Sequence, residues 1–192
     1  NFPGLETGVD LFNMLTSSQM AVALWLVAMI LFALAGRPLE ALAVFFISGV
    51  WLADQALGVL ISRPGPPPEI VETMGIVKTA TFPSGHVSGA VIFYGILSFL
   101  ALSNLKSSRL RIAIPAAAII LVALVSIARV YSMAHWPTDI LGSYLLGAIG
   151  IVAIAWGYLR VKEDRLSIPK PWARKKVPPK TEPGVLIAHS IG

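Results

Sequence analysis

Five apolar stretches of about 20 residues constrain the fold of this chain more than any other feature of its sequence. They cover residues 19–36, 38–61, 85–103, 112–131 and 137–160. A helix needs about 20 mostly apolar residues to cross the hydrocarbon core of a bilayer. Because 56% of the 192 residues are apolar and only 13% are charged, a soluble globule could not bury this much apolar surface. We therefore predict an all-α, polytopic membrane protein, an antiparallel bundle of five spanning helices.

Residues that stop helices separate the five stretches. Gly36, Arg37 and Pro38 predict a tight turn between the first two, and the proline-rich run 63–68 cannot continue the second helix because most of its residues lack a backbone donor or favour turns. Pro137 sits in the first turn of the fifth helix, where its missing N–H does no harm. We predict a surface segment at residues 1–18, a transmembrane domain at 19–160 and a basic, proline-rich tail at 161–192.

The distribution of basic residues predicts the orientation of the bundle. Lys106, Arg109 and Arg111 lie in the loop between the third and fourth helices, and the tail from Arg160 onward carries eight basic residues against three acidic ones. Positive residues mark the cytoplasmic side of a bacterial inner membrane. The tail is thus predicted to be cytoplasmic, and the opposite face, where acids balance Arg63, to be extracytoplasmic.

The same charges limit the partners of the chain. Its basic residues form two clusters and not one face interleaved with aromatics, which excludes nucleic-acid binding. We expect the tail to contact anionic lipid headgroups or a partner subunit that orders it. The chain contains no cysteine, which excludes thiolate chemistry, disulfides and sulfur-ligated metals.

Polar and ionisable residues gather where four of the predicted helices begin or end on one face. Such residues are costly in a membrane and usually mark function. Alternate connections of an antiparallel bundle emerge on the same side, so these groups should meet at one surface. The set comprises Arg63, Ser84, Gly85, His86, Arg129, His135 and Asp139.

This combination of groups suits a phosphate. Guanidinium groups bind phosphate oxygens bidentately, and the backbone N–H groups that open a helix stabilise an anion. Two histidines can divide the chemistry: His135 attacks phosphorus while Asp139 accepts a hydrogen bond from its other ring nitrogen. His86 then protonates the leaving oxygen.

The motifs that hold these residues resemble those of a known family. Pro83-Ser84-Gly85-His86, and Arg129 followed by His135 and Asp139 at spacings of six and four, are similar to the second and third signature motifs of the type 2 phosphatidic acid phosphatase superfamily. Arg63-Pro64 resembles the end of the first motif. The resemblance implies a helical bundle that works through a phosphohistidine intermediate with no metal or other cofactor. It assigns His135 as nucleophile, His86 as acid and Asp139 as the residue that orients the nucleophile, with phosphate ligands at Arg63, Ser84, Gly85 and Arg129.

The chain departs from the family pattern in the first motif. The lysine usually found seven residues before the arginine is replaced by Ala56, and the serine usually found before Arg129 is Ala128. Lys78, in the loop that precedes the second motif, is the candidate replacement for the missing cation. The family also usually has a further spanning helix before the first one present here.

Each candidate also has a structural interpretation. Arginines at helix ends can anchor the interface by snorkelling, and Ser84 and Gly85 could merely cap a helix. His135 and Asp139 could ligate a metal, but no third ligand is evident and Pro137 between them disfavours a regular helical face. Asp54, inside the second helix, is expected to pair with Lys78 or hydrogen-bond a neighbouring helix; a carboxylate beside bound phosphate would repel it, which disfavours direct catalysis.

The function we predict is a metal-independent phosphatase that acts on a membrane lipid phosphate or pyrophosphate. Polyprenyl pyrophosphate, phosphatidylglycerol phosphate, phosphatidate and diacylglycerol pyrophosphate are all candidate substrates. The alternative is a subunit that keeps the fold but has a structural or binding role in a larger membrane complex. A phosphotransferase with an acceptor other than water would share the same intermediate.

Overall fold

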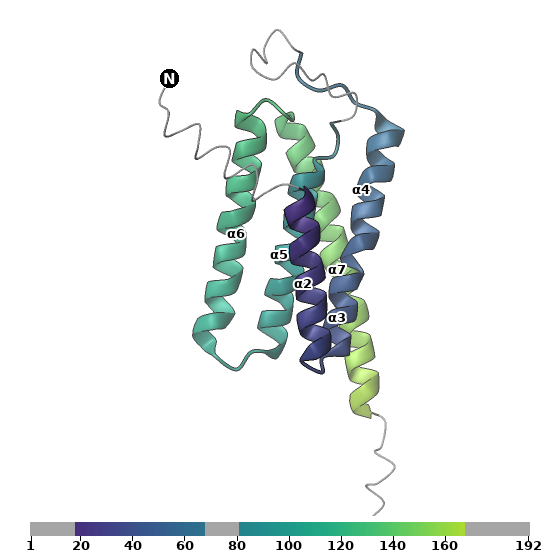
Figure 1. Ribbon diagram of the computed structural model, residues 1–192, viewed down its shortest axis with the longest axis vertical. Helices are drawn as coiled ribbons and strands as arrows, with labels where there is room; N and C mark the ends of the chain where they lie inside the picture. The colour runs from purple at the N-terminus through teal and green to yellow at the C-terminus, as the bar shows by residue number, and fades with distance from the viewer. Residues whose placement is uncertain (1–17, 68–80, 168–192) are drawn as a thin grey trace, which may run out of the picture.

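The computed structural model describes residues 18–67 and 81–167, which form helices and turns without a strand. The helices stand side by side in an antiparallel bundle (Figure 1). They are α2 (Ser18–Leu34), α3 (Pro38–Phe45), α4 (Ile47–Ile61), α5 (Gly85–Asn104), α6 (Ser108–Tyr131) and α7 (Pro137–Ser167). The predicted all-α fold is confirmed.

Four of the five predicted spans are long and apolar enough to cross a membrane: Pro38–Ile61, Gly85–Asn104, Ser108–Tyr131 and Pro137–Asp164. The first of these combines α3 and α4, which meet at Phe46 with a helix-like φ of −66° and ψ of −10°. The remaining span corresponds to α2, which is apolar but, at 17 residues, shorter than the other four.

The turn between α2 and α3 follows from its sequence. Gly36 has a φ of +68°, a conformation that glycine adopts without the penalty a Cβ imposes. The N–H of Arg37 bonds the carbonyl of Phe32 and the N–H of Gly36 bonds that of Ala33, at 2.9 and 3.1 Å. This pairing is the Schellman motif, which satisfies the last carbonyls of a helix.

Helix α7 continues to Ser167, beyond the predicted end at residue 160. The added turns contain residues with good helix propensity and no proline. Lys162 also gains contacts there: its ammonium group donates to Asn104 Oδ1 at 3.0 Å and lies 5.4 Å from the centre of the Tyr158 ring. The apolar stretch therefore predicts where the membrane span ends but not where the helix ends.

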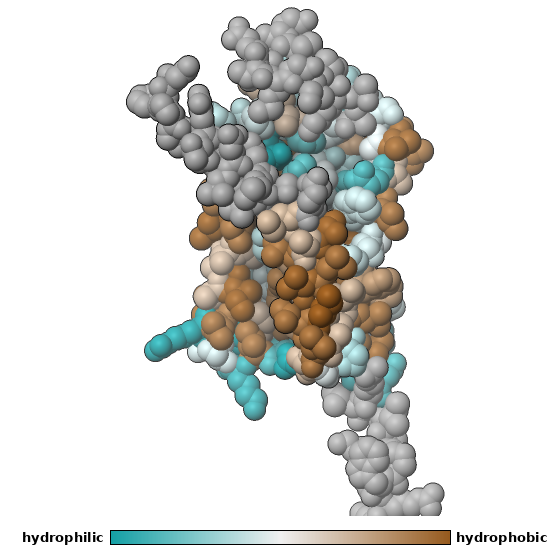
Figure 2. Space-filling view, viewed as in Figure 1, coloured by the Kyte–Doolittle hydropathy of each residue, from teal (hydrophilic) through white to brown (hydrophobic). Residues whose placement is uncertain are grey.

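The core lies where α3, α4, α5 and α7 meet. Val44, Ile92 and Ile96 are almost fully buried there, with Tyr158 against them. Many large apolar side chains instead point outward, and on the face shown in Figure 2 apolar residues cover the middle of the bundle with polar residues towards its ends. Such an apolar outer surface suits contact with lipid tails.

The topology brings the predicted motifs to one end of the bundle. Helices α4 and α6 end there and α5 and α7 begin there, at the top of Figure 1. Figure 1 also shows α7 extending past the other helices at the opposite end. The prediction that these helix ends share one face of the bundle is confirmed.

Candidate active site

The His135 side chain is held by a backbone carbonyl. Its Nδ1 lies 2.8 Å from the carbonyl oxygen of Thr81, and the side chain is buried. Because a carbonyl oxygen only accepts, Nδ1 carries the proton, and in the neutral imidazole Nε2 then holds the lone pair. This contact fixes the orientation of the imidazole ring.

The position of Asp139 differs from the prediction. Its Oδ2 lies 3.8 Å from His135 Nδ1, too far for a hydrogen bond. The nearer acceptor for the His135 Nδ1 proton is the carbonyl oxygen of Thr81 at 2.8 Å. Backbone carbonyls carry no side-chain signal in a sequence, which is why Thr81 was not predicted.

Asp139 is nevertheless fully buried and well paired. Its Oδ1 accepts from Arg63 Nη1 at 3.0 Å, and its Oδ2 accepts from the backbone N–H of Trp136 at 3.0 Å. The second bond joins the third residue of α7 to the residue that caps the helix, half of a capping box. One carboxylate therefore closes the start of α7 and holds the arginine that follows α4.

Arg63 connects α4 to α7. Its Nη1 donates to Thr138 Oγ1 at 2.6 Å as well as to Asp139, and its carbonyl accepts from the N–H of Thr81 at 3.0 Å. The side chain is 37% exposed, and a guanidinium offers five N–H donors on three nitrogens. Arg63 can therefore bind an anion while its Nη1 stays paired with Asp139.

Ser84 is held from α7 by Ser143, a residue that the sequence analysis did not identify. Ser143 Oγ accepts from the Ser84 N–H at 2.8 Å and lies 3.1 Å from the Ser84 carbonyl and 2.8 Å from the Asp139 carbonyl. The Ser84 N–H is therefore bonded to Ser143 in this structure, and the role of Ser84 as a phosphate ligand stays a prediction. The spacing of four residues from Asp139 is the signal that could have identified Ser143, because residues i and i+4 share one face of a helix.

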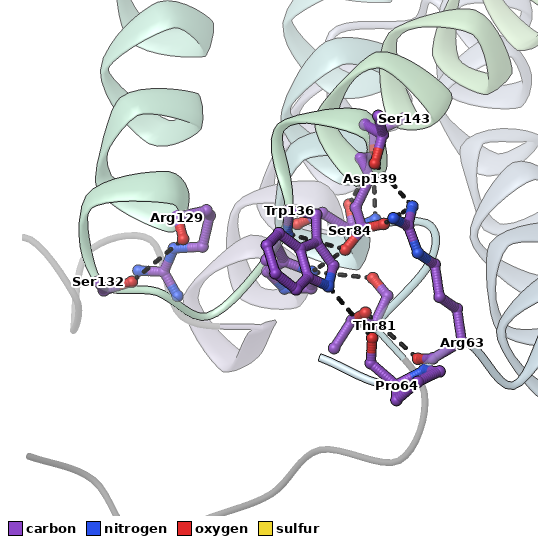
Figure 3. Close-up of polar contacts among 11 residues, drawn as sticks. Arg63, Pro64, Thr81, Ser84, Arg129, Ser132, Trp136, Asp139 and Ser143 are labelled. Atoms are coloured by element: carbon purple, nitrogen blue, oxygen red, sulfur yellow. Dashed lines mark hydrogen bonds and ion pairs between the residues drawn. The ribbon is translucent and has the colours of Figure 1, made fainter. Parts of the chain in front are cut away.

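Gly85 and His86 open α5 and present the start of the helix at this end of the bundle. The carbonyl of Ser84 accepts from the N–H groups of both Val87 and Ser88 at 2.9 Å, and the N-terminal end of a helix is a favourable place for an anion. Figure 3 shows Ser84, Ser143, Asp139 and Arg63 in one cluster, with Thr81 and Trp136 beside it.

Arg129 lies in the last turn of α6 and is buried. In Figure 3 it lies to one side of the cluster that Arg63 and Asp139 form. Lys78, the candidate replacement for the missing cation, lies outside the described residues, as do the predicted surface segment at 1–17 and the tail from residue 168 onward.

An apolar groove of about 430 Å³ lies between α2, α4 and α5 and reaches the predicted site. Trp25, Trp51 and Phe93 line it, and Gly85 and His86 form part of its wall. A larger groove of about 530 Å³ runs between α3, α4 and α7 and contains none of the predicted site residues. Among the described residues, no group of three histidine, cysteine or acidic side chains is placed to hold a metal ion.

The helical fold and the motifs at its end are those of a membrane phosphatase class, and a comparison with known protein families identifies the family. Residues 37–163, more than half of the chain, match the PAP2 superfamily. The chain belongs to this superfamily, and the resemblance seen in its motifs is confirmed.

Individual relatives agree with this assignment. A stretch of 78 residues is 38% identical to the putative undecaprenyl-diphosphatase YbjG of Escherichia coli (strain K12) and covers 40% of this chain. The match spans 35% of that relative's length. The fold is similar to the crystal structure of the first transmembrane PAP2-type phosphatidylglycerolphosphate phosphatase from Bacillus subtilis, with a TM-score of 0.69 and 20% identity over 88% of this chain and 82% of that chain.

Proposed function

We propose that the protein removes phosphate from a membrane lipid phosphate or diphosphate through a phosphohistidine intermediate. The observation that carries the proposal is the orientation of His135. Its Nδ1 donates to the Thr81 carbonyl at 2.8 Å, which places the lone pair of the neutral ring on Nε2, the atom that we assign to attack phosphorus. Arg63 and the first turn of α5 stand at the same end of the bundle to receive the phosphate oxygens.

The reaction proceeds in two displacements. His135 Nε2 forms a bond to phosphorus while the bond from phosphorus to the leaving oxygen breaks, and His86 gives that oxygen a proton. The imidazolium that results is stabilised by the Thr81 carbonyl and by the negative charge of Asp139 at 3.8 Å. Water then gives a proton to His86 as it attacks phosphorus, the bond from phosphorus to Nε2 breaks, and inorganic phosphate leaves with both histidines restored to their starting protonation.

A lipid substrate is supported by the groove between α2, α4 and α5. Its wall is almost entirely apolar, and the proposed proton donor His86 lies in it. The leaving group should therefore carry the hydrocarbon portion into this groove. The names of the two relatives, an undecaprenyl diphosphatase and a phosphatidylglycerolphosphate phosphatase, support the same substrate class.

We place the site on the extracytoplasmic side of a bacterial inner membrane. The support is the charge distribution: Lys106 lies between α5 and α6, and Arg109 and Arg111 lie at the start of α6, at the end of the bundle opposite the site. Positive residues mark the cytoplasmic side. The tail at the end of α7 is cytoplasmic in the same scheme.

The experiment that tests the function is phosphate release from purified protein in detergent and chelator, with phosphorylated and pyrophosphorylated lipids. We expect His135→Ala to lower kcat by at least about a thousandfold because the nucleophile is lost. The chain has three histidines, so His189→Ala, outside the family match, is the matched control and should keep wild-type activity. Phosphate release that persists in His135→Ala contradicts the phosphohistidine route.

A structural or binding role in a membrane complex is the second candidate, and the observation in its favour is Ala56. A family member that lacks one phosphate-binding lysine has lost part of its electrostatic stabilisation. Wild-type protein that turns over none of the lipid phosphates supports this role.

A further inference from the structure

The buried carboxylate of Asp54 lies next to the proposed phosphate site and takes no part in the proposed reaction. Asp54 stands in the middle of the largely apolar helix α4, is only 3% exposed, and accepts from Gln55 Nε2 at 3.4 Å. Burying such a group is costly unless it is hydrogen-bonded. The hydrogen bonds and contacts of Asp54 therefore indicate its role.

Asp54 connects α4 to the first turn of α5. Ser88 Oγ donates to Asp54 Oδ1 at 2.6 Å, and Ser88 is itself buried. Ser88 also bonds through its N–H to the Ser84 carbonyl at 2.9 Å, so it belongs to the turn that contains Gly85 and His86. The carboxylate is thus one hydrogen bond away from the helix start that should receive the phosphate.

The same carboxylate rests on Gly85. A Cβ placed on Gly85 would lie 3.1 Å from Asp54 Oδ2, closer than most atoms approach a Cβ. Because Gly85 has no side chain, the carboxylate can pack directly against its backbone. The glycine of this motif is therefore explained by its contact with α4 as well as by the approach of a phosphate.

The turn is held by contacts from two helices, α7 and α4. Ser143 of α7 bonds the N–H and carbonyl of Ser84 at 2.8 and 3.1 Å, while Asp54 of α4 binds Ser88. Arg63 follows the end of the same α4, nine residues after Asp54, about 14 Å along a helix. Asp54 therefore connects α4, which leads to Arg63, with the first turn of α5, which contains Gly85 and His86.

We propose that Asp54 is a positioning residue: it holds the first turn of α5 through Ser88 and Gly85 so that the N–H groups and the His86 side chain face the phosphate. The inference rests on the proposed function. A direct contact with phosphate is excluded by repulsion between two anions, so Asp54 acts through the turn. The missing lysine of the first motif makes this positioning more important, because fewer cations remain to hold the phosphate.

The test compares four variants: Asp54→Ala, Asp54→Asn, Ser88→Ala and the Asp54→Ala/Ser88→Ala double variant. Tyr158→Phe is the matched control. The hydroxyl of Tyr158 in α7 also connects helices, because it hydrogen-bonds Asn104 of α5 and Glu40 of α3 at the opposite end of the bundle. The measurements are kcat and KM on a lipid phosphate in detergent, vanadate affinity by calorimetry, and the melting temperature. Vanadate mimics the transferring phosphoryl group.

We expect Asp54→Ala to lower kcat by about 100-fold, the cost of displacing catalytic groups by about 1 Å, and to weaken vanadate binding at least tenfold. Asp54→Asn keeps an acceptor for Ser88 and should restore both within a few fold. Ser88→Ala should resemble Asp54→Ala, and the double variant should lose no more than either single one, because both remove the same contact. Tyr158→Phe should lower the melting temperature without changing kcat or vanadate affinity.

Asp54→Ala with wild-type kcat and vanadate affinity overturns the inference. So does Asp54→Ala that loses stability and activity only to the extent that Tyr158→Phe does, or Asp54→Asn that is as impaired as Asp54→Ala. Wild-type protein that binds vanadate but releases no phosphate from any lipid contradicts the proposed function instead, and the vanadate affinities of the variants then decide the role of Asp54. Wild-type protein that does neither contradicts both.

Discussion

At the scale of single residues, the site depends on hydrogen bonds between side chains and backbone. His135 is oriented by the Thr81 carbonyl, Asp139 closes the start of α7, and Ser143 bonds both polar groups of the Ser84 backbone. The first and the last of these contacts join segments that lie far apart in the sequence. A small displacement of one element therefore reaches several groups of the site.

Ser143→Ala is the prediction at this scale. The substitution leaves the buried Ser84 N–H without its acceptor, which should lower the free energy of unfolding by about 1–3 kcal/mol and reduce kcat. Ser98→Ala is the matched control, because the Ser98 hydroxyl bonds the Tyr94 carbonyl of its own helix and its removal should change the stability little. Denaturation in detergent and phosphate release are the measurements. Equal stability losses in the two variants would show that the contact to Ser84 contributes nothing.

At the scale of elements, glycines allow α7 to lie close to its neighbours. A Cβ on Gly147 would overlap Val91 of α5, and one on Gly150 would come within 2.6 Å of Val50 of α4. Small residues permit such close approach of helices in membrane proteins. This closeness brings Ser143 within hydrogen-bonding distance of Ser84.

Two glycines of α7 provide a paired prediction. Gly147→Ala inserts a methyl group into a filled space and should destabilise the protein by about 1–3 kcal/mol. At Gly157 a Cβ meets no atom within 4 Å, so Gly157→Ala should leave the stability unchanged or raise it by up to about 1 kcal/mol through helix propensity. Melting temperatures of both variants in the same detergent check this. A Gly147→Ala protein as stable as wild type would mean that α5 and α7 can separate without cost.

At the scale of the whole molecule, charge and apolar surface define how the bundle lies in a membrane. The outward apolar side chains in Figure 2 lie between a polar end that carries the site and an end that carries Lys106, Arg109 and Arg111. The proposed orientation puts these ends on opposite sides of the bilayer.

The absence of cysteine makes this orientation directly measurable. Single cysteines at Pro67, beyond the end of α4, and at Ser108, at the start of α6, occupy exposed positions at opposite ends of the bundle. In intact bacterial spheroplasts we expect a membrane-impermeant maleimide to label Pro67→Cys and to label Ser108→Cys only after lysis. The reverse pattern would place the site in the cytoplasm.

Much of the fold and of the site was predictable from particular residues. The apolar stretches and their stop signals located the helices, because backbone groups in lipid must be satisfied within each helix. The structure links the predicted motif residues to one another or to shared partners. Arg63 pairs with Asp139, Ser84 bonds Ser143 of the same helix as Asp139, and His135 bonds Thr81 (Figure 3). The end of α7 was missed because a helix can continue into water after its apolar face has ended.

The sequence by itself determined the helical class, the family and the residue types of the site, since these depend on hydropathy and on motifs that are local in the chain. Only the tertiary structure decided which partner each group takes. Thr81 replaces Asp139 as the hydrogen-bond acceptor of His135, Ser143 binds the Ser84 N–H, and Asp54 rests against Gly85. These contacts depend on distances of a few ångström between segments far apart in the sequence, and such distances are set by how closely the helices pack.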